Sequence, residues 1–151
     1  MAIATELAAV YTAPPIPVEE IAARAGVKVV WATFGELQND VLAVCDFANR
    51  TININAEEPP ERQHYAIAHE LGHFVLHEDA LRNDPDSYTL LPRSRTLEPD
   101  AFEQEVHSFA SELLVPERLL MQVAHKAPPA ELARIFKVPI ELMERRLKRG
   151  R

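Results

Sequence analysis

The sequence predicts an α+β fold that is mainly helical and contains a small three-stranded antiparallel sheet. Apolar residues recur at helical spacing along most of the chain. Twelve prolines against four glycines indicate helices that are punctuated by proline. Short segments rich in β-branched residues interrupt this pattern and are typical of strands. A chain of 151 residues is the size of one domain and can bury a core.

Two short helices are expected at the N-terminus, over 4–11 and 17–26. Pro14-Pro15 stops the first helix. Pro17 suits the first turn of the second helix, and Gly26 suits its C-terminal cap.

The predicted sheet follows these helices. Strands are expected over 28–32 (KVVWA), 40–47 (DVLAVCDF) and 51–55 (TININ). The link 48–50 is a plausible hairpin turn between the last two strands, so we expect them to pair antiparallel.

The rest of the chain should consist of helices and one long loop. Acidic residues and prolines precede a long helix expected over 61–77. Residues 79–99 are polar and contain proline, which predicts an exposed loop, and a loop of this length is more often functional than idle. Further helices are expected over 100–114, 117–125, 129–137 and 140–149. We expect a single domain, 1–151, made of a core (1–116) and a C-terminal helical tail (117–151).

The charge balance and the cysteine count exclude several classes of function. The net charge of −7 argues against nucleic acid or an anionic membrane as a partner of the whole surface. No glycine-rich phosphate-binding motif is present. Cys45 is the only cysteine, which excludes an intrachain disulfide and a CxxC zinc site. The N-terminus lacks a basic signal region and no long apolar run occurs, so we expect a cytoplasmic protein without a membrane span.

The strongest local signal is the motif HELGH at 69–73, within the predicted helix 61–77. Residues four apart lie on one helix face, so His69 and His73 can bind one ion together, and neutral imidazole is a good zinc ligand. Glu70 lies about 100° around the helix, where it can act as the general base on a water beside the metal. The alternative is a pair of half-buried histidines that bond to neighbours. We expect one Zn²⁺ per chain and metallopeptidase chemistry.

A catalytic zinc ion needs a third protein ligand, and two acids on the predicted helix 100–114 compete for this role. Glu103 shares its face with apolar residues, whereas Glu105 lies on a more mixed face. Because a ligand must point inward, Glu103 is favoured. His77 lies one turn beyond His73 and could reach the ion only if the helix bent. We therefore expect it to cap the helix or pack against neighbouring residues, and less often to hydrogen-bond one of the metal ligands.

Other side chains are candidates for contacts around the ion or the substrate. His107 lies one turn beyond Glu103 and could hydrogen-bond a metal-bound imidazole or the ligand carboxylate. Tyr88 and His125 are candidates for stabilising an oxyanion, although a structural role is the simpler interpretation of each.

An exposed edge of the sheet could hold a substrate as an added strand. We expect the strand 51–55 to be that edge, with Asn53 or Asn55 turned toward solvent.

Several segments together resemble the ImmA/IrrE family of gluzincin-like zinc peptidases. They are RQHYAIAHELGHFVLH at 62–77, EQEVHSFASELLVP at 103–116 and LARIFKVPIELMERRL at 132–147, and the upstream IPVEEIAARAGVKVV and TININ segments fit the same layout. The resemblance implies a zincin-like fold, zinc ligands at His69, His73 and Glu103, and a catalytic Glu70. Position 107 is usually Asn in the family and is His here, and position 106 is usually a small residue and is Val here.

The resemblance also implies a substrate class. Family members cleave helix-turn-helix transcriptional repressors in mobile elements or stress regulons, so a zinc-dependent endopeptidase with a repressor as its protein substrate is the first hypothesis. A module that binds such a repressor or a toxin without cleaving it is the second. DNA binding by the C-terminal helices, with basic residues from Arg145 to Arg151, is the third. Basic residues are also favoured at a helix C-terminus by its dipole, so we expect no direct contact with nucleic acid.

Overall fold

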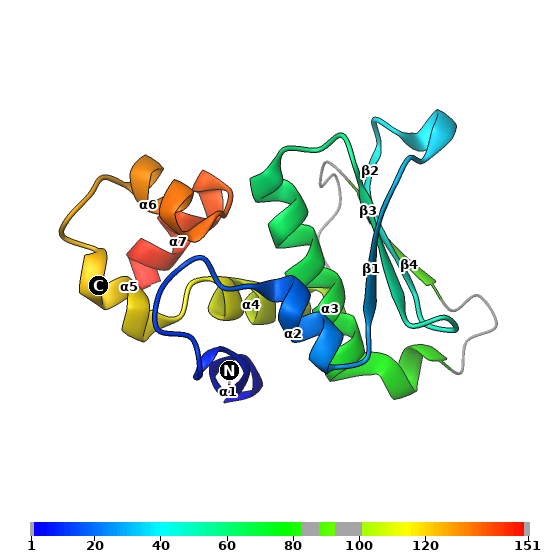
Figure 1. Cartoon of the computed structure of the whole chain (residues 1–151), viewed down its shortest axis with the longest axis horizontal. Helices are drawn as coiled ribbons and strands as arrows, with labels where there is room; N and C mark the ends of the chain where they lie inside the picture. The colour runs from blue at the N-terminus through cyan, green and yellow to red at the C-terminus, as the bar shows by residue number, and fades with distance from the viewer. Residues whose placement is uncertain (1, 83–87, 93–100, 150–151) are drawn as a thin grey trace.

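The computed structural model describes residues 2–82, 88–92 and 101–149, and it places one sheet at the side of a group of helices (Figure 1). The helices are α1 (Ala2–Ala8), α2 (Val18–Arg24), α3 (Pro60–Arg82), α4 (Ala101–Leu114), α5 (Glu117–Val123), α6 (Pro129–Phe136) and α7 (Ile140–Arg149). The strands are β1 (Lys28–Ala32), β2 (Val41–Asp46), β3 (Thr51–Asn55) and β4 (Tyr88–Pro92), and the 3-10 helix η1 (Gly35–Leu37) lies between β1 and β2. The predicted α+β class is confirmed. None of the described helices is long and apolar enough to cross a membrane.

The sheet is mixed and four-stranded, which corrects the expected three antiparallel strands. Its order is β1-β3-β2-β4. Strand β2 pairs antiparallel with β3 and with β4, whereas β1 pairs parallel with β3. The predicted hairpin between β2 and β3 is confirmed, and Arg50 in its turn has a left-handed backbone conformation with φ at 47°. Residue patterns identify strands, but the neighbours of a strand depend on how the connections pack, which those patterns do not encode.

The expectation that 51–55 forms an exposed edge is wrong, because β3 pairs with β1 on one side and with β2 on the other. Asn55 is 1% exposed, and its amide group donates to the carbonyl oxygens of Gln38 at 2.7 Å and Val41 at 2.9 Å. Asn53 is half-buried. Alternation along a strand identifies its two faces but does not show whether its two edges are paired.

Part of the predicted loop 79–99 forms regular structure. Helix α3 continues to Arg82, and β4 pairs with β2 over Tyr88–Pro92. Residues 83–87 and 93–99 of that prediction lie outside the described residues, as does residue 100 of the predicted helix 100–114. The YTLL segment of β4 is short and is surrounded by prolines and charges. Its strand conformation therefore depends on pairing with β2 more than on its own pattern.

Helix α3 packs against the sheet on one side and against α4 on another, so it forms the centre of the core (Figure 1). Gly72 lies where α3 and α4 come closest. A Cβ atom at Gly72 would lie 3.0 Å from Cδ1 of Phe109 and 3.1 Å from Cβ of Val106. These distances are shorter than ordinary van der Waals contacts, so the glycine permits the close approach of the two helices.

His64 joins the first turns of α3 to distant parts of the chain. Its buried imidazole is hydrogen-bonded to the backbone of Ile16, and the positive charge of Lys137 acts on it. Burial, and then the charge of Lys137, lower the pKa of His64 to about 4. The folded protein therefore holds this imidazole neutral at neutral pH.

Replacing Gly72 by valine should destabilise the protein. The branched side chain would overlap Val106 and Phe109, and overpacking of this kind costs about 1–3 kcal/mol, more than the small gain in helix propensity. Urea unfolding would measure the loss. Ala80→Val, at an exposed position of the same helix, is the control and should change the free energy of unfolding by less than about 0.5 kcal/mol. Equal effects of the two substitutions would contradict the packing argument.

His64 should make stability depend on pH. The pKa of this imidazole is about 4 in the folded protein and about 6.5 in the unfolded chain, so the unfolded chain binds the proton first as the pH falls. The stabilisation that comes from keeping His64 neutral is complete above about pH 6.5. It is lost between pH 6.5 and 4, where the free energy of unfolding falls by on the order of 3 kcal/mol. The free energy of unfolding of wild type relative to His64→Gln should decrease over this range. His125→Gln, which replaces an exposed histidine, is the matched control.

Candidate metal centre

Three buried side chains that can ligate a metal lie together on α3. His69, Glu70 and His73 are 1%, 0% and 2% exposed. Each offers a ligand atom, and these atoms all lie within 4.8 Å of one another. The two imidazole centroids are 5.4 Å apart, as the i, i+4 spacing predicts. Burying such groups in an apolar core is costly unless they are paired or bind a metal.

Glu103 approaches both imidazoles from α4. Its Oε2 lies 3.1 Å from Nε2 of His69, and its Oε1 lies 3.0 Å from Nε2 of His73. Two ligands of one tetrahedral zinc ion, each about 2.0–2.1 Å from it, would be about 3.3–3.4 Å apart. The observed spacing is therefore within a few tenths of an ångström of what a shared ion requires.

These short distances are not aligned hydrogen bonds. Within the described parts of the chain, Nε2 of His69 and both ring nitrogens of His73 are buried without a hydrogen-bond partner. Buried polar atoms are normally satisfied, so this exception needs an explanation. Nitrogen and oxygen atoms that converge without hydrogen-bond alignment are expected where they share a cation. Two imidazoles and a carboxylate are also a donor set that binds zinc and leaves one position open.

Glu70 contacts the opposite nitrogen of the His69 ring. Its Oε1 lies 3.3 Å from Nδ1 of His69, whereas Glu103 faces Nε2 of the same ring. Glu70, the candidate general base, and Glu103 therefore lie at different nitrogens of the His69 ring. Below, the cluster means His69, Glu70, His73 and Glu103.

The pKa values of His69 and Glu103 are shifted in opposite directions. Burial lowers the pKa of His69, but the carboxylates of Glu103 and Glu70 outweigh this effect and raise it above its usual value. Partial burial raises the pKa of Glu103, but His69 and His73 hold it well below its usual range. Without a metal, His69 therefore tends to hold a proton. A metal ion must displace that proton, so binding should weaken as the pH falls.

His77 and Glu105 form a separate pair one turn further along. Nε2 of His77 lies 3.3 Å from Oε2 of Glu105, and the His77 ring stacks on Phe102 with centroids 4.1 Å apart. The side chain of Glu105 is 52% exposed. Of the two competing acids, Glu103 is the one that reaches the HELGH histidines.

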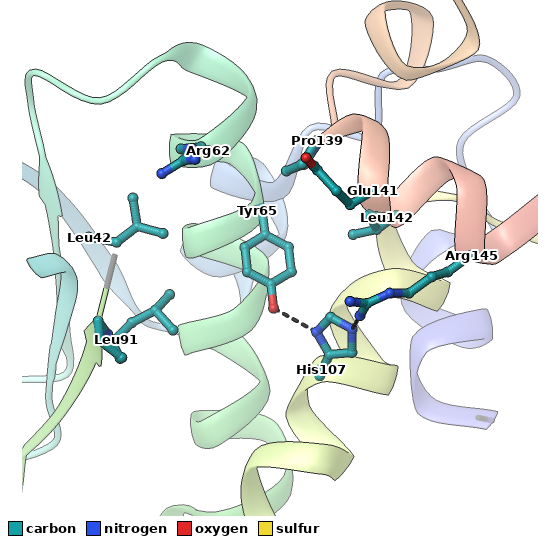
Figure 2. A pocket seen from close by; sticks show the side chains of 10 residues that line it. Leu42, Arg62, Tyr65, Leu91, His107, Pro139, Glu141, Leu142 and Arg145 are labelled. Carbon is teal, nitrogen blue, oxygen red and sulfur yellow. Dashed lines mark hydrogen bonds between the residues drawn. The ribbon is translucent and has the colours of Figure 1, made fainter. Parts of the chain in front are cut away.

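Tyr65, His107 and Arg145 form a chain of contacts from three helices (Figure 2). The hydroxyl of Tyr65 lies 2.7 Å from Nδ1 of His107, and Nη1 of Arg145 lies 3.1 Å from Nε2 of the same ring. The described hydrogen-bond partners of His107 are therefore residues outside the candidate metal centre. Sequence reasoning missed Tyr65 and Arg145. The position of Tyr65 one turn before His69 was an available signal, whereas no local pattern indicates that α7 packs beside α4.

A cavity of about 310 Å³ lies beside this chain of contacts (Figure 2). Its lining includes apolar residues from the sheet and from α7, such as Leu42, Leu91 and Leu142, together with the charged Arg62 and Glu141. Tyr65 and His107 also line it, and each is one helical turn from a residue of the cluster. The cavity therefore adjoins the candidate metal centre and has room for a side chain of a bound peptide.

The remaining candidates lie at other places. Tyr88 begins β4 opposite Asp46, and its side chain lies outside the described residues. His125 is exposed and lines a separate cavity that also includes Arg146. Asn55 is used inside the fold, as described above.

Comparison with known proteins gives one family. The profile Peptidase_M78, described as an IrrE N-terminal-like domain, matches residues 19–148. This range includes α3 and α4, which carry the cluster. No curated protein matches the chain. The family supports a metallopeptidase-type function and a metal cofactor. The chain therefore belongs to the Peptidase_M78 (ImmA/IrrE) family of metallopeptidases.

Proposed function

We propose that the protein is a zinc-dependent endopeptidase in which His69, His73 and Glu103 hold the ion and Glu70 is the general base. The observation that carries this proposal is the convergence of two unsatisfied Nε2 atoms on one carboxylate, each about 3 Å from one of its oxygens, with Glu70 buried beside them. A structural role alone would not require so many buried ionisable groups in one place.

The chain's own residues would then divide the work. Zinc at this position would lower the pKa of water toward about 7 and polarise the scissile carbonyl. Glu70 would accept the proton of the attacking water and transfer it to the leaving amine nitrogen. Glu103 and the two histidines would orient the site, and the apolar core around the imidazoles keeps these rings buried.

The substrate backbone is proposed to bind at β4, in place of the strand 51–55. Strand β4 is at the end of the strand order, and its residues Leu91 and Pro92 line the cavity next to Tyr65. An extended peptide added to this edge would gain backbone hydrogen bonds and could place one side chain in the cavity.

A helix-turn-helix repressor remains the proposed substrate, because the family likeness supports it, and such a substrate would place the enzyme in the cytoplasm. The basic helix α7 gives little support to the alternative of DNA binding. Arg145 contacts His107, Arg146 donates to the carbonyl oxygen of Val115 at 2.7 Å, and Arg149 lies 3.9 Å from Glu112. These side chains therefore serve contacts within the chain.

Glu70→Gln should abolish cleavage while the metal is retained. The amide cannot accept the proton, and loss of general-base catalysis lowers kcat by about 10²–10⁴-fold. The assay is digestion of a helix-turn-helix repressor, with zinc content measured in parallel. Asp79→Asn, an exposed acid on the same helix, is the control and should cleave normally. Normal cleavage by Glu70→Gln would refute the assignment of the base. A wild type that binds the repressor without cutting it would favour the binding module.

Glu103→Ala should lose zinc, whereas Glu105→Ala should keep about one ion per chain. Glu103 faces both imidazoles, while Glu105 pairs with His77 away from them. Removing a direct ligand should weaken binding by more than the ~10–100-fold that loss of an outer contact costs. Elemental analysis after gel filtration gives the stoichiometry. Greater loss from Glu105→Ala would show that the wrong acid has been chosen.

A further inference from the structure

The contact between Arg145 and His107 determines where the imidazole carries its hydrogen. A guanidinium group only donates hydrogen bonds, so Nε2 of His107, 3.1 Å from Nη1 of Arg145, must be the acceptor. In a neutral imidazole one nitrogen accepts and the other carries the hydrogen. The hydrogen of His107 therefore lies on Nδ1, the nitrogen that faces Tyr65.

In this tautomer the Tyr65 hydroxyl accepts a hydrogen bond from His107, whereas in the other tautomer it would donate one. Nδ1 of His107 and the hydroxyl of Tyr65 are 2.7 Å apart. Because Nδ1–H donates, the Tyr65 oxygen accepts, and its own hydrogen must be directed away from His107. Figure 2 shows Tyr65 reaching from α3 between the sheet and α7, and its side chain lines the cavity.

Tyr65 also lies close to the candidate metal centre. Its ring centroid is 5.7 Å from that of His69, and it precedes His69 by one helical turn of about 5.4 Å. A peptide held at β4 with a side chain in the cavity would pass this hydroxyl.

We propose that Arg145 holds His107 in the Nδ1–H tautomer, so that the Tyr65 hydroxyl donates its hydrogen to the carbonyl oxygen of a bound peptide as that oxygen becomes negative. Tyr65 is then a catalytic residue that touches the substrate, and His107 and Arg145 are positioning residues. The inference rests on the proposed function for its substrate, whereas the tautomer of His107 is a property of the protein without substrate.

The tautomer can be measured by two-bond ¹H–¹⁵N correlation NMR on zinc-loaded protein labelled with ¹⁵N-histidine. The His107 signals are identified by their loss in His107→Asn, which introduces the residue usual in the family. We expect hydrogen on Nδ1 and a bare Nε2 in wild type and in Tyr65→Phe. Arg145→Met should move hydrogen to Nε2, whereas Arg149→Met, which removes a charge one turn further along α7, should not. A wild-type His107 with hydrogen on Nε2, or an Arg145→Met variant without change, would overturn the proposal.

Kinetics with the repressor substrate test the second step. Tyr65→Phe should lower kcat by about 10²–10³-fold, as expected for loss of one oxyanion donor, with KM within a few-fold and zinc content unchanged. Arg145→Met should also lower kcat, whereas Arg149→Met should cleave the substrate normally. A normal kcat in the Tyr65→Phe variant would refute the catalytic role of Tyr65. If wild type cleaves nothing, the proposed function fails, while the NMR result still decides the tautomer.

Discussion

The close packing of α3 against α4 is the constraint on which the rest of the molecule depends. Gly72 leaves no side chain between the helices, and Val106 and Phe109 fill the space directly above it. This approach brings Glu103, one turn before Val106, within about 3 Å of both HELGH histidines. Burial of the contact also removes water from the imidazoles, which strengthens every electrostatic interaction among them.

The cluster is costly for folding because its ionisable groups are buried among apolar side chains. The opposite pKa shifts of His69 and Glu103 show partial compensation by a charge pair. The unsatisfied nitrogens of His73 show that this compensation is incomplete in the described residues. A bound cation would satisfy these atoms. The free energy that their burial costs without a metal would then contribute to metal affinity.

Elements from the middle of the chain and from its C-terminal part meet next to the cluster. Strand β4 contributes the sheet edge, α3 and α4 contribute Tyr65 and His107, and α7 contributes Arg145. The C-terminal helices therefore do more than cover the core, because Arg145 reaches an imidazole whose other nitrogen faces the cavity-lining tyrosine. This arrangement connects the C-terminal helices to the proposed peptide-binding surface.

The sequence alone determined most helices, three of the strands, the hairpin and the grouping of His69, Glu70 and His73, because each depends on spacing within one segment. The face of α4 could also be predicted, and it favoured Glu103 over Glu105. The inner position of β3, the existence of β4 and the contact between Arg145 and His107 become visible only in the folded protein. Those features arise from contacts between segments far apart in the chain, and local periodicity carries no record of which distant segment becomes a neighbour.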